Sequence, residues 1–133
     1  MKRTLGRTIA IAVAAAGIAL TNTSAYADGS NVTAYTQQDS SGTSGGEVTF
    51  KPYGEHLYIV DDVKNGESVV AHMQYGSKDQ WWFNSEGAGT TRHLNFDIAE
   101  GTEVAIAACR GHWKGSVAKS EIWACGVWKV TTA

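Results

Sequence analysis

Histidine is the side chain best suited to acid–base chemistry and metal binding near neutral pH, and the chain contains four. They are His56, His72, His93 and His112, spread over separate segments without the H-x-H or H-E-x-x-H spacing of common metal sites. Strand alternation puts His72 and His93 on outward faces, so these two could meet across a sheet. We expect exposed or hydrogen-bonded histidines, no metal ion and no cofactor.

Paired carboxylates are a second candidate for chemistry. Asp61 and Asp62 are adjacent, with Glu55 upstream, which could suggest acid–base catalysis or a calcium site. Neighbouring residues on a strand point to opposite faces, so the two aspartates would not converge. The sequence indicates instead that they cap a turn before Asn65 and Gly66.

The segment Gly42-Thr-Ser-Gly-Gly46 is close to the Gly-Asp-Ser-Gly-Gly sequence around the nucleophilic serine of chymotrypsin-like proteases. Thr43 stands where that aspartate belongs, and one small domain cannot provide the two barrels that align serine, histidine and aspartate. No other pairing of a nucleophile with a base is recognisable, so we predict a protein that is not an enzyme.

The only cysteines are Cys109 and Cys125. They lack the C-x-x-C spacing of zinc and redox sites, whereas an even pair in an exported chain indicates one disulfide. The bond would close a loop of about 17 residues and stabilise the fold by about 3 kcal/mol in the chain-entropy estimate. Trp123 and Trp128 flank the second cysteine and are predicted to pack on the disulfide.

Five tryptophans are the strongest lead to a function. If Trp81, Trp82 and Phe83 lie on one strand, the first and third share a face and Trp82 takes the other. Each sheet of a sandwich has one buried face, so one tryptophan of the pair must face outward. An exposed tryptophan is costly unless neighbouring side chains cover it or a ligand contacts it.

The loop between the cysteines holds four further candidate contact residues: Arg110, His112, Trp113 and Lys114. Positive charge, an aromatic ring and flanking glycines could bind an acidic or glycan partner, or form a solvated turn. These four residues, with Trp81 and Trp82, are the predicted binding residues.

Short apolar runs rich in Val, Ile, Thr and aromatic residues predict strands throughout residues 28–133. The predicted strands cover residues 31–36, 47–51, 56–61, 67–75, 81–84, 92–98, 103–109 and 122–130. A polar Gly/Ser stretch at residues 37–46 predicts a mobile loop. Seven or eight short strands without an amphipathic helix indicate an all-β fold, an antiparallel immunoglobulin-like sandwich, with a small β-barrel as the alternative.

Residues 1–27 have the pattern of a secretory signal peptide: a basic start, an apolar run too short to span a bilayer, and a small-x-small site that ends at Ala27. We therefore expect a single domain over residues 28–133, secreted as a monomer without a membrane span. The formal net charge is −2, and loss of the basic leader leaves a more acidic domain. This charge argues against nucleic-acid binding.

The chain resembles a loose group of small secreted actinobacterial proteins of unassigned function. The resemblance rests on the alanine-rich leader, the early Gly/Ser-rich loop and a tail with Ala99-Glu-Gly-Thr102, Cys109, Cys125 and Trp128. It implies export and a β domain with one disulfide, and it carries over no catalytic residues.

These features predict a secreted, non-catalytic binding module that contacts an extracellular protein or glycan through exposed aromatic residues. The alternative is a secreted inhibitor or toxin that acts on another organism's enzyme or envelope. A loop braced by a disulfide suits insertion into a cleft, because little conformational freedom is lost on binding.

Overall fold

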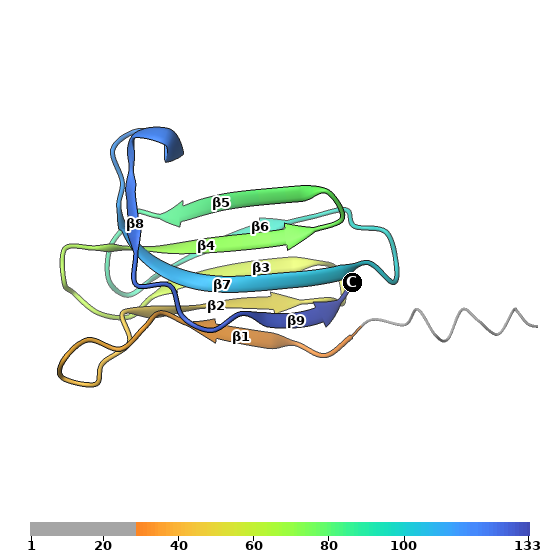
Figure 1. The fold of residues 1–133 in the computed structure, drawn as a ribbon, viewed down its shortest axis with the longest axis horizontal. Helices are drawn as coiled ribbons and strands as arrows, with labels where there is room; N and C mark the ends of the chain where they lie inside the picture. The colour runs from red at the N-terminus through yellow and green to blue at the C-terminus, as the bar shows by residue number, and fades with distance from the viewer. Residues whose placement is uncertain (1–28) are drawn as a thin grey trace, which may run out of the picture.

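Residues 29–133 form two antiparallel β-sheets that pack face to face in the computed structural model, which describes this part of the chain (Figure 1). The first sheet has the strand order β1-β2-β3-β6; the second has the order β5-β4-β7-β8, and β9 also pairs with β7. The expected signal peptide, residues 1–27, lies outside the described residues. The strands are β1 Val32–Tyr35, β2 Gly46–Lys51, β3 His56–Asp61, β4 Ser68–Tyr75, β5 Lys78–Asn84, β6 Thr90–Asn95, β7 Glu103–His112, β8 Glu121–Trp123 and β9 Lys129–Thr132, with a short 3-10 helix at Val117–Lys119.

Alternation of apolar residues along the strands produces the core between the two sheets. Leu57 and Ile59 of β3 are fully buried, and Met73 of β4 and Ile106 of β7 meet them from the second sheet. Side chains of this size each stabilise the fold by roughly 1.5–3 kcal/mol when they leave water. The inner faces are therefore the part of the molecule that fixes the strand register.

The strand pairing is that of an immunoglobulin-like sandwich, as the sequence predicts. β3 pairs with β6 in one sheet and β4 pairs with β7 in the other, so the chain crosses between the sheets after β3, β5 and β6. These pairs correspond to strands B with E and C with F of that fold. The alternative of a small barrel is wrong, because the two sheets do not close on one another.

The predicted last strand over residues 122–130 is interrupted at residues 124–128, between β8 and β9. Ala124 has a φ of 55°, in the left-handed region that ends regular strand geometry. A Cβ on Gly126 would lie 1.9 Å from the carbonyl oxygen of Tyr35, so only glycine fits there. The segment between the two strands stays beside β7, because the Gly126 N–H donates to the Ala108 carbonyl at 2.9 Å and Cys125 is bonded to Cys109.

Residues 37–46, predicted as a mobile loop, contain a hydrogen-bonded turn. The Asp39 carboxylate accepts bonds from the backbone N–H groups of Ser41 and Thr43, at 2.8 and 3.0 Å, and from the Ser41 hydroxyl at 2.6 Å. These bonds, that from the Ser41 hydroxyl first, lower the pKa of Asp39. Turn chemistry of aspartate thus gives the segment a defined conformation.

Cys109 and Cys125 form the predicted disulfide. Cys109 lies on the outward face of the second sheet, directly opposite Val70, and these two form a small buried cluster with Phe83. Ile122 packs against this cluster. The disulfide therefore joins β7 to a segment of its own sheet, whereas the disulfide of antibody domains joins the two sheets.

Within residues 29–133, no helix has the length and apolar character needed to cross a bilayer.

Candidate functional site: an aromatic face on the second sheet

Three aromatic side chains form a row across the outward face of the second sheet. His72 on β4 lies directly opposite Trp81 on the edge strand β5. Their rings are parallel to within 12°, with centroids 3.6 Å apart. The ring of Trp128, next to the first residue of β9, lies 4.7 Å from that of His72 at an angle of 57°. The row therefore connects one edge of the sheet to the other.

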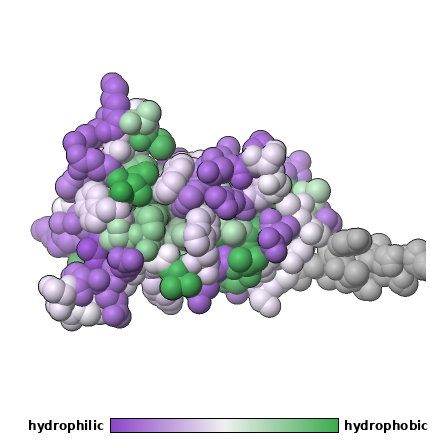
Figure 2. Space-filling view, in the orientation of Figure 1, coloured by the Kyte–Doolittle hydropathy of each residue, from purple (hydrophilic) through white to green (hydrophobic). Residues whose placement is uncertain are grey.

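Exposed apolar side chains continue this row toward β1. Val130 follows Trp128 on the same face of β9, and these side chains are 53% and 41% exposed. Val127 and Tyr35, at 75% and 54% exposure, line a groove of about 260 Å³. We call these residues, with His72 and Trp81, the aromatic face. Figure 2 shows hydrophobic residues gathered over β7 and β9, with hydrophilic residues around them.

A carboxylate fixes the central ring of the aromatic face. Asp79 Oδ1 lies 2.5 Å from His72 Nε2 and accepts a second, longer bond of 3.3 Å from the Gln74 amide. The bond from the His72 side chain is the main reason why the pKa of Asp79 is lowered. The face therefore has a charged margin along β4 and β5, beside its apolar centre.

The end of the β7–β8 hairpin projects beyond β5 as an arm, residues 112–121 (Figure 1). Trp113, at the base of this arm, packs its ring 5.1 Å from that of Phe83 at the end of β5. Trp113 keeps 43% of its surface exposed, so it extends the aromatic surface of the sheet onto the arm.

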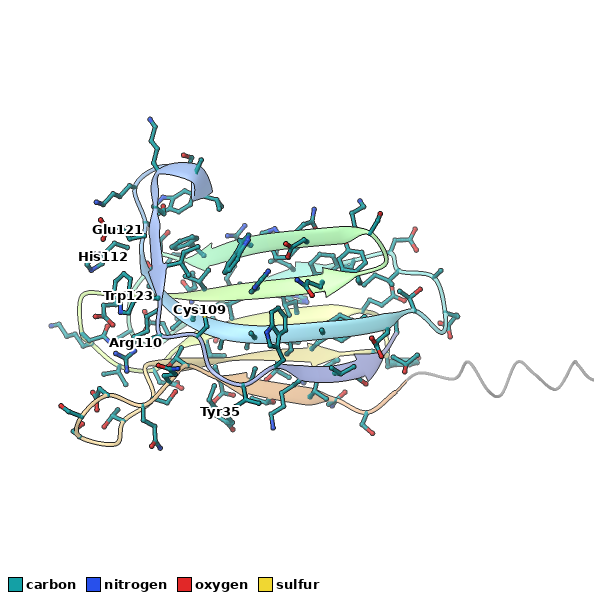
Figure 3. The ribbon with its side chains drawn as sticks, viewed as in Figure 1. Tyr35, Cys109, Arg110, His112, Glu121 and Trp123 are labelled. Carbon is teal, nitrogen blue, oxygen red and sulfur yellow. A yellow bond between two sulfur atoms is a disulfide. The ribbon has the colours of Figure 1, made fainter. Side chains whose placement is uncertain are left out.

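Glu121 pairs with two of the basic residues of the arm, Lys114 and His112. Its carboxylate accepts a 2.9 Å bond from Lys114 Nζ and lies 3.6 Å from His112 Nδ1. The bond from Lys114 is the largest cause of the lowered pKa of Glu121. His112 also lies edge-on to Trp123, with ring centroids 4.9 Å apart. Figure 3 shows His112 and Glu121 on the arm, with Trp123 below them. The positive charge that the sequence predicts at Lys114 is thus largely offset by Glu121.

Arg110, a predicted binding residue, holds the early loop against the sheet. Its Nη2 donates to the carbonyl oxygens of Gln37 and Thr43, at 2.8 and 3.4 Å, and its Nε lies 3.7 Å from Glu67 Oε1. Its side chain is only 13% exposed. Figure 3 shows Arg110 at the base of the arm. Its contacts are therefore internal.

Trp82, also a predicted binding residue, faces the core. It packs against the main buried cluster and makes an edge-on contact with Phe96, with centroids 5.1 Å apart. The predicted alternation of Trp81, Trp82 and Phe83 is correct, and the structure identifies Trp81 as the outward tryptophan. Of the two tryptophans, Trp81 therefore remains the candidate contact residue.

The sequence prediction that His72 and His93 could meet is wrong, because they lie on the outward faces of different sheets. The serine of the protease-like segment, Ser44, donates to the Gly46 carbonyl at 3.0 Å and contacts the Thr36 hydroxyl at 2.9 Å. Within residues 29–133 its hydrogen bonds involve no histidine.

Sequence reasoning missed four members of the aromatic face: Tyr35, His72, Val127 and Val130. It also placed Trp128 on the disulfide, because the two are close in sequence, whereas the ring lies against His72. The two-residue spacing of Trp128 and Val130 was an available signal. The spacing alone does not show that this face points outward, because that depends on the pairing of β9 with β7.

In the described part of the chain, no group of three or more His, Cys, Asp and Glu side chains could hold a metal ion. No protein-family model, curated protein or solved structure matches this chain.

Proposed function

We propose that this chain is a secreted, non-catalytic binding module whose aromatic face contacts a protein outside the cell. The observation that carries the proposal is the row Trp81, His72 and Trp128, continued by Val127 and Val130 on a face that lies outside the core.

The outward face of an antiparallel sheet is ordinarily polar, because it meets water. Here its centre carries two tryptophans and two exposed valines instead. Contiguous apolar surface of this kind, with a polar margin, is typical of interaction sites. Tryptophan and tyrosine supply large contact area with few rotatable bonds, which makes them frequent energetic centres of interfaces.

The arrangement of the rings favours a protein over a glycan. Stacking on His72 covers one ring face of Trp81, and Trp128 approaches His72 from the direction of β7. A sugar ring stacks best on an open aromatic face, whereas side chains of a protein can fill the spaces between upright rings. The exposed valines beside them offer aliphatic contact without hydrogen-bonding groups.

Two features support an extracellular compartment. Residues 1–27 have the composition of a cleavable export signal. The oxidised pair Cys109 and Cys125 is compatible with the extracellular space, where disulfides persist.

The experiment is affinity capture with the immobilised domain from culture medium and cell-wall material. The variants are Trp128→Ala and Trp81→Ala, and the matched control is Tyr53→Ala, because Tyr53 is an aromatic residue with 85% exposure outside the aromatic face. We expect a protein captured by the wild-type domain and by Tyr53→Ala, and at least tenfold weaker capture by both tryptophan variants.

Three outcomes would contradict the proposal. The first is equal capture by all variants. The second is tryptophan fluorescence quenched by a polysaccharide, with no protein captured, which would assign the face to a glycan. The third is concentration-dependent dimerisation in sedimentation velocity that Trp128→Ala abolishes, which would assign the face to a second copy of the chain.

A further inference from the structure

Two histidine rings and an amide converge on the outward face of the first sheet, opposite the aromatic face. His56 on β3 lies directly across from Asn95 on β6, and His93 precedes Asn95 by two residues on the same face. His56 Nδ1 is 2.8 Å from His93 Nε2 and 2.6 Å from Asn95 Oδ1. Three polar atoms from two strands thus meet at one point.

Hydrogen bonding alone leaves this cluster incompletely satisfied. A neutral imidazole nitrogen carries either one hydrogen or one lone pair. If His56 Nδ1 carries a hydrogen, the His93 nitrogen and the Asn95 oxygen compete for it. If His56 Nδ1 carries a lone pair, two donors compete for that lone pair once the Asn95 amide is turned to present its nitrogen. Each arrangement leaves one polar group short of a full hydrogen bond within the cluster, so its partner must come from water or from a bound cation.

A cation that accepts lone pairs satisfies all three atoms at once. We propose that His56 Nδ1, His93 Nε2 and Asn95 Oδ1 bind a divalent transition-metal ion of the zinc and copper type. Imidazole nitrogen is a preferred ligand of Zn²⁺ and Cu²⁺, and a carbonyl oxygen is an accepted third ligand. Tetrahedral zinc with bonds of about 2.0 Å places two nitrogens about 3.3 Å apart, so the two nitrogens would separate by about half an ångström and the rings would turn to direct their lone pairs at the ion.

The surrounding residues hold the rings in the required orientation. The ring of Tyr58 stacks on that of His93 with centroids 4.5 Å apart and planes within 4°. Lys51 Nζ lies 5.0 Å from the Tyr58 ring. Behind His56, a Cβ at Gly54 would come within 2.6 Å of Nε2, so the backbone confines the ring on that side and leaves Nδ1 for the ion. Support of this kind around the ligands is typical of metal sites.

His93 and Asn95 are exposed, so water can complete the coordination. Three protein ligands and an accessible position distinguish this arrangement from a closed structural zinc site, which has four protein ligands. The cluster lies on the opposite sheet from the aromatic face, so the inference is independent of the proposed function.

The test is titration of the purified protein, without a polyhistidine tag, with ZnCl₂ and separately with CuCl₂ by isothermal calorimetry. We expect one ion per chain, at least tenfold weaker binding in His56→Gln and in His93→Gln, and a smaller loss in Asn95→Ala. The matched control is His72→Gln, which removes a histidine from the other sheet and should bind as the wild type does.

A second measurement identifies the ligand atoms without relying on variants. Long-range proton–nitrogen NMR spectra should show metal-induced shifts at Nδ1 of His56 and Nε2 of His93, and none of that size in the rings of His72 and His112. The proposal is overturned if neither ion binds, if His93→Gln retains full affinity, or if the shifts fall on other histidines.

Discussion

The imidazole of His72 lies parallel to the indole of Trp81, with ring centroids 3.6 Å apart, and the same imidazole contacts Asp79 through Nε2. One side chain therefore links the edge strand β5 to the centre of its sheet by stacking and by a hydrogen bond. Because Trp128 also lies against this ring, the orientation of both tryptophans depends on His72. The aromatic face is thus held in place before any partner arrives, which reduces the ordering cost of binding.

Replacing His72 should disorganise the aromatic face without unfolding the protein. His72→Ala removes an aromatic contact of the kind that stabilises proteins by about 1 kcal/mol, so we expect a loss of that size in the free energy of unfolding. The near-UV circular dichroism of the tryptophans should weaken as well. His93→Ala, which changes a histidine on the other sheet whose ring contacts His56 and Tyr58, is the control. An unchanged near-UV spectrum in His72→Ala would show that the rings are held by other contacts.

Substitution of Trp82 should mainly lower stability, whereas substitution of Trp81 should mainly weaken binding. Trp82→Ala opens a cavity beside Phe96 in the main core, and such truncations cost about 3–5 kcal/mol. Trp81→Ala acts on the outward face and should cost considerably less, while it weakens partner capture. Urea unfolding of both variants, followed by far-UV circular dichroism, measures the difference. Equal losses of stability would mean that Trp81 is as important to packing as Trp82.

Asp61 should contribute more to the free energy of unfolding at acid pH than at neutral pH. The residue is buried, and within residues 29–133 its Oδ1 has no hydrogen-bond partner, so desolvation raises the pKa of its carboxyl above 3.8. The folded state therefore binds this proton more tightly than the unfolded state does. The resulting stabilisation is fully present below pH 3.8 and is lost as the pH rises through the raised pKa.

Asp61→Asn should consequently raise the free energy of unfolding relative to wild type at pH 7, and much less at pH 3. Urea unfolding at the two pH values tests this, with the exposed neighbour Asp62→Asn as the control. If Asp61→Asn is destabilised equally at both pH values, a lost bond rather than charge burial governs the site.

Arg110 should act as a structural residue. Arg110→Ala removes the donors to the carbonyl oxygens of Gln37 and Thr43 and leaves the half-buried Glu67 without its cation. Bonds from a charged donor contribute about 1.5–3 kcal/mol each, and we expect a total loss of about 2 kcal/mol. Hydrogen exchange of residues 37–45 should accelerate. Lys64→Ala, an exposed cation, is the control; unchanged exchange in Arg110→Ala would restore Arg110 as a candidate contact residue.

Reduction of the disulfide should loosen the arm more than the sandwich. The cross-link spans a sequence separation of 16, for which the chain-entropy estimate is about 3 kcal/mol. The inner core does not include the sulfurs, so the far-UV spectrum of the reduced protein should still be that of a β-sheet. Urea unfolding with and without a reductant, combined with hydrogen exchange of residues 112–121, checks both expectations. Loss of all β-structure on reduction would contradict them.

The fold was largely predictable from the sequence because its main determinant is local. Alternation in β3 and β4 marks the inner face, and the turn residues between the runs mark the strand ends. The pairing of β3 with β6 was not predictable in the same way, because it joins segments separated by two strands of the other sheet.

The candidate site was less predictable than the fold, because its members are brought together by pairings between distant strands. Trp81 and Trp128 share one face only because β4 and β7 lie between their strands. The alternation rule stated that one of Trp81 and Trp82 faces outward, and the choice depended on the register with β4. The pairing of Lys114 and His112 with Glu121 depends on the register of β8 with β7, which no local pattern reveals.

The cystine at the base of the arm separates the stability of the sandwich from the sequence of the arm. Because β7 and the segment before β9 are already tied together there, we expect residues 115–119, beyond the Trp113 contact with Phe83, to accept changes in length and sequence while the sandwich keeps its architecture. We therefore expect the tip of the arm to tolerate substitution better than the strands do. A foreign peptide could be inserted at its tip to test how much variation the scaffold accepts.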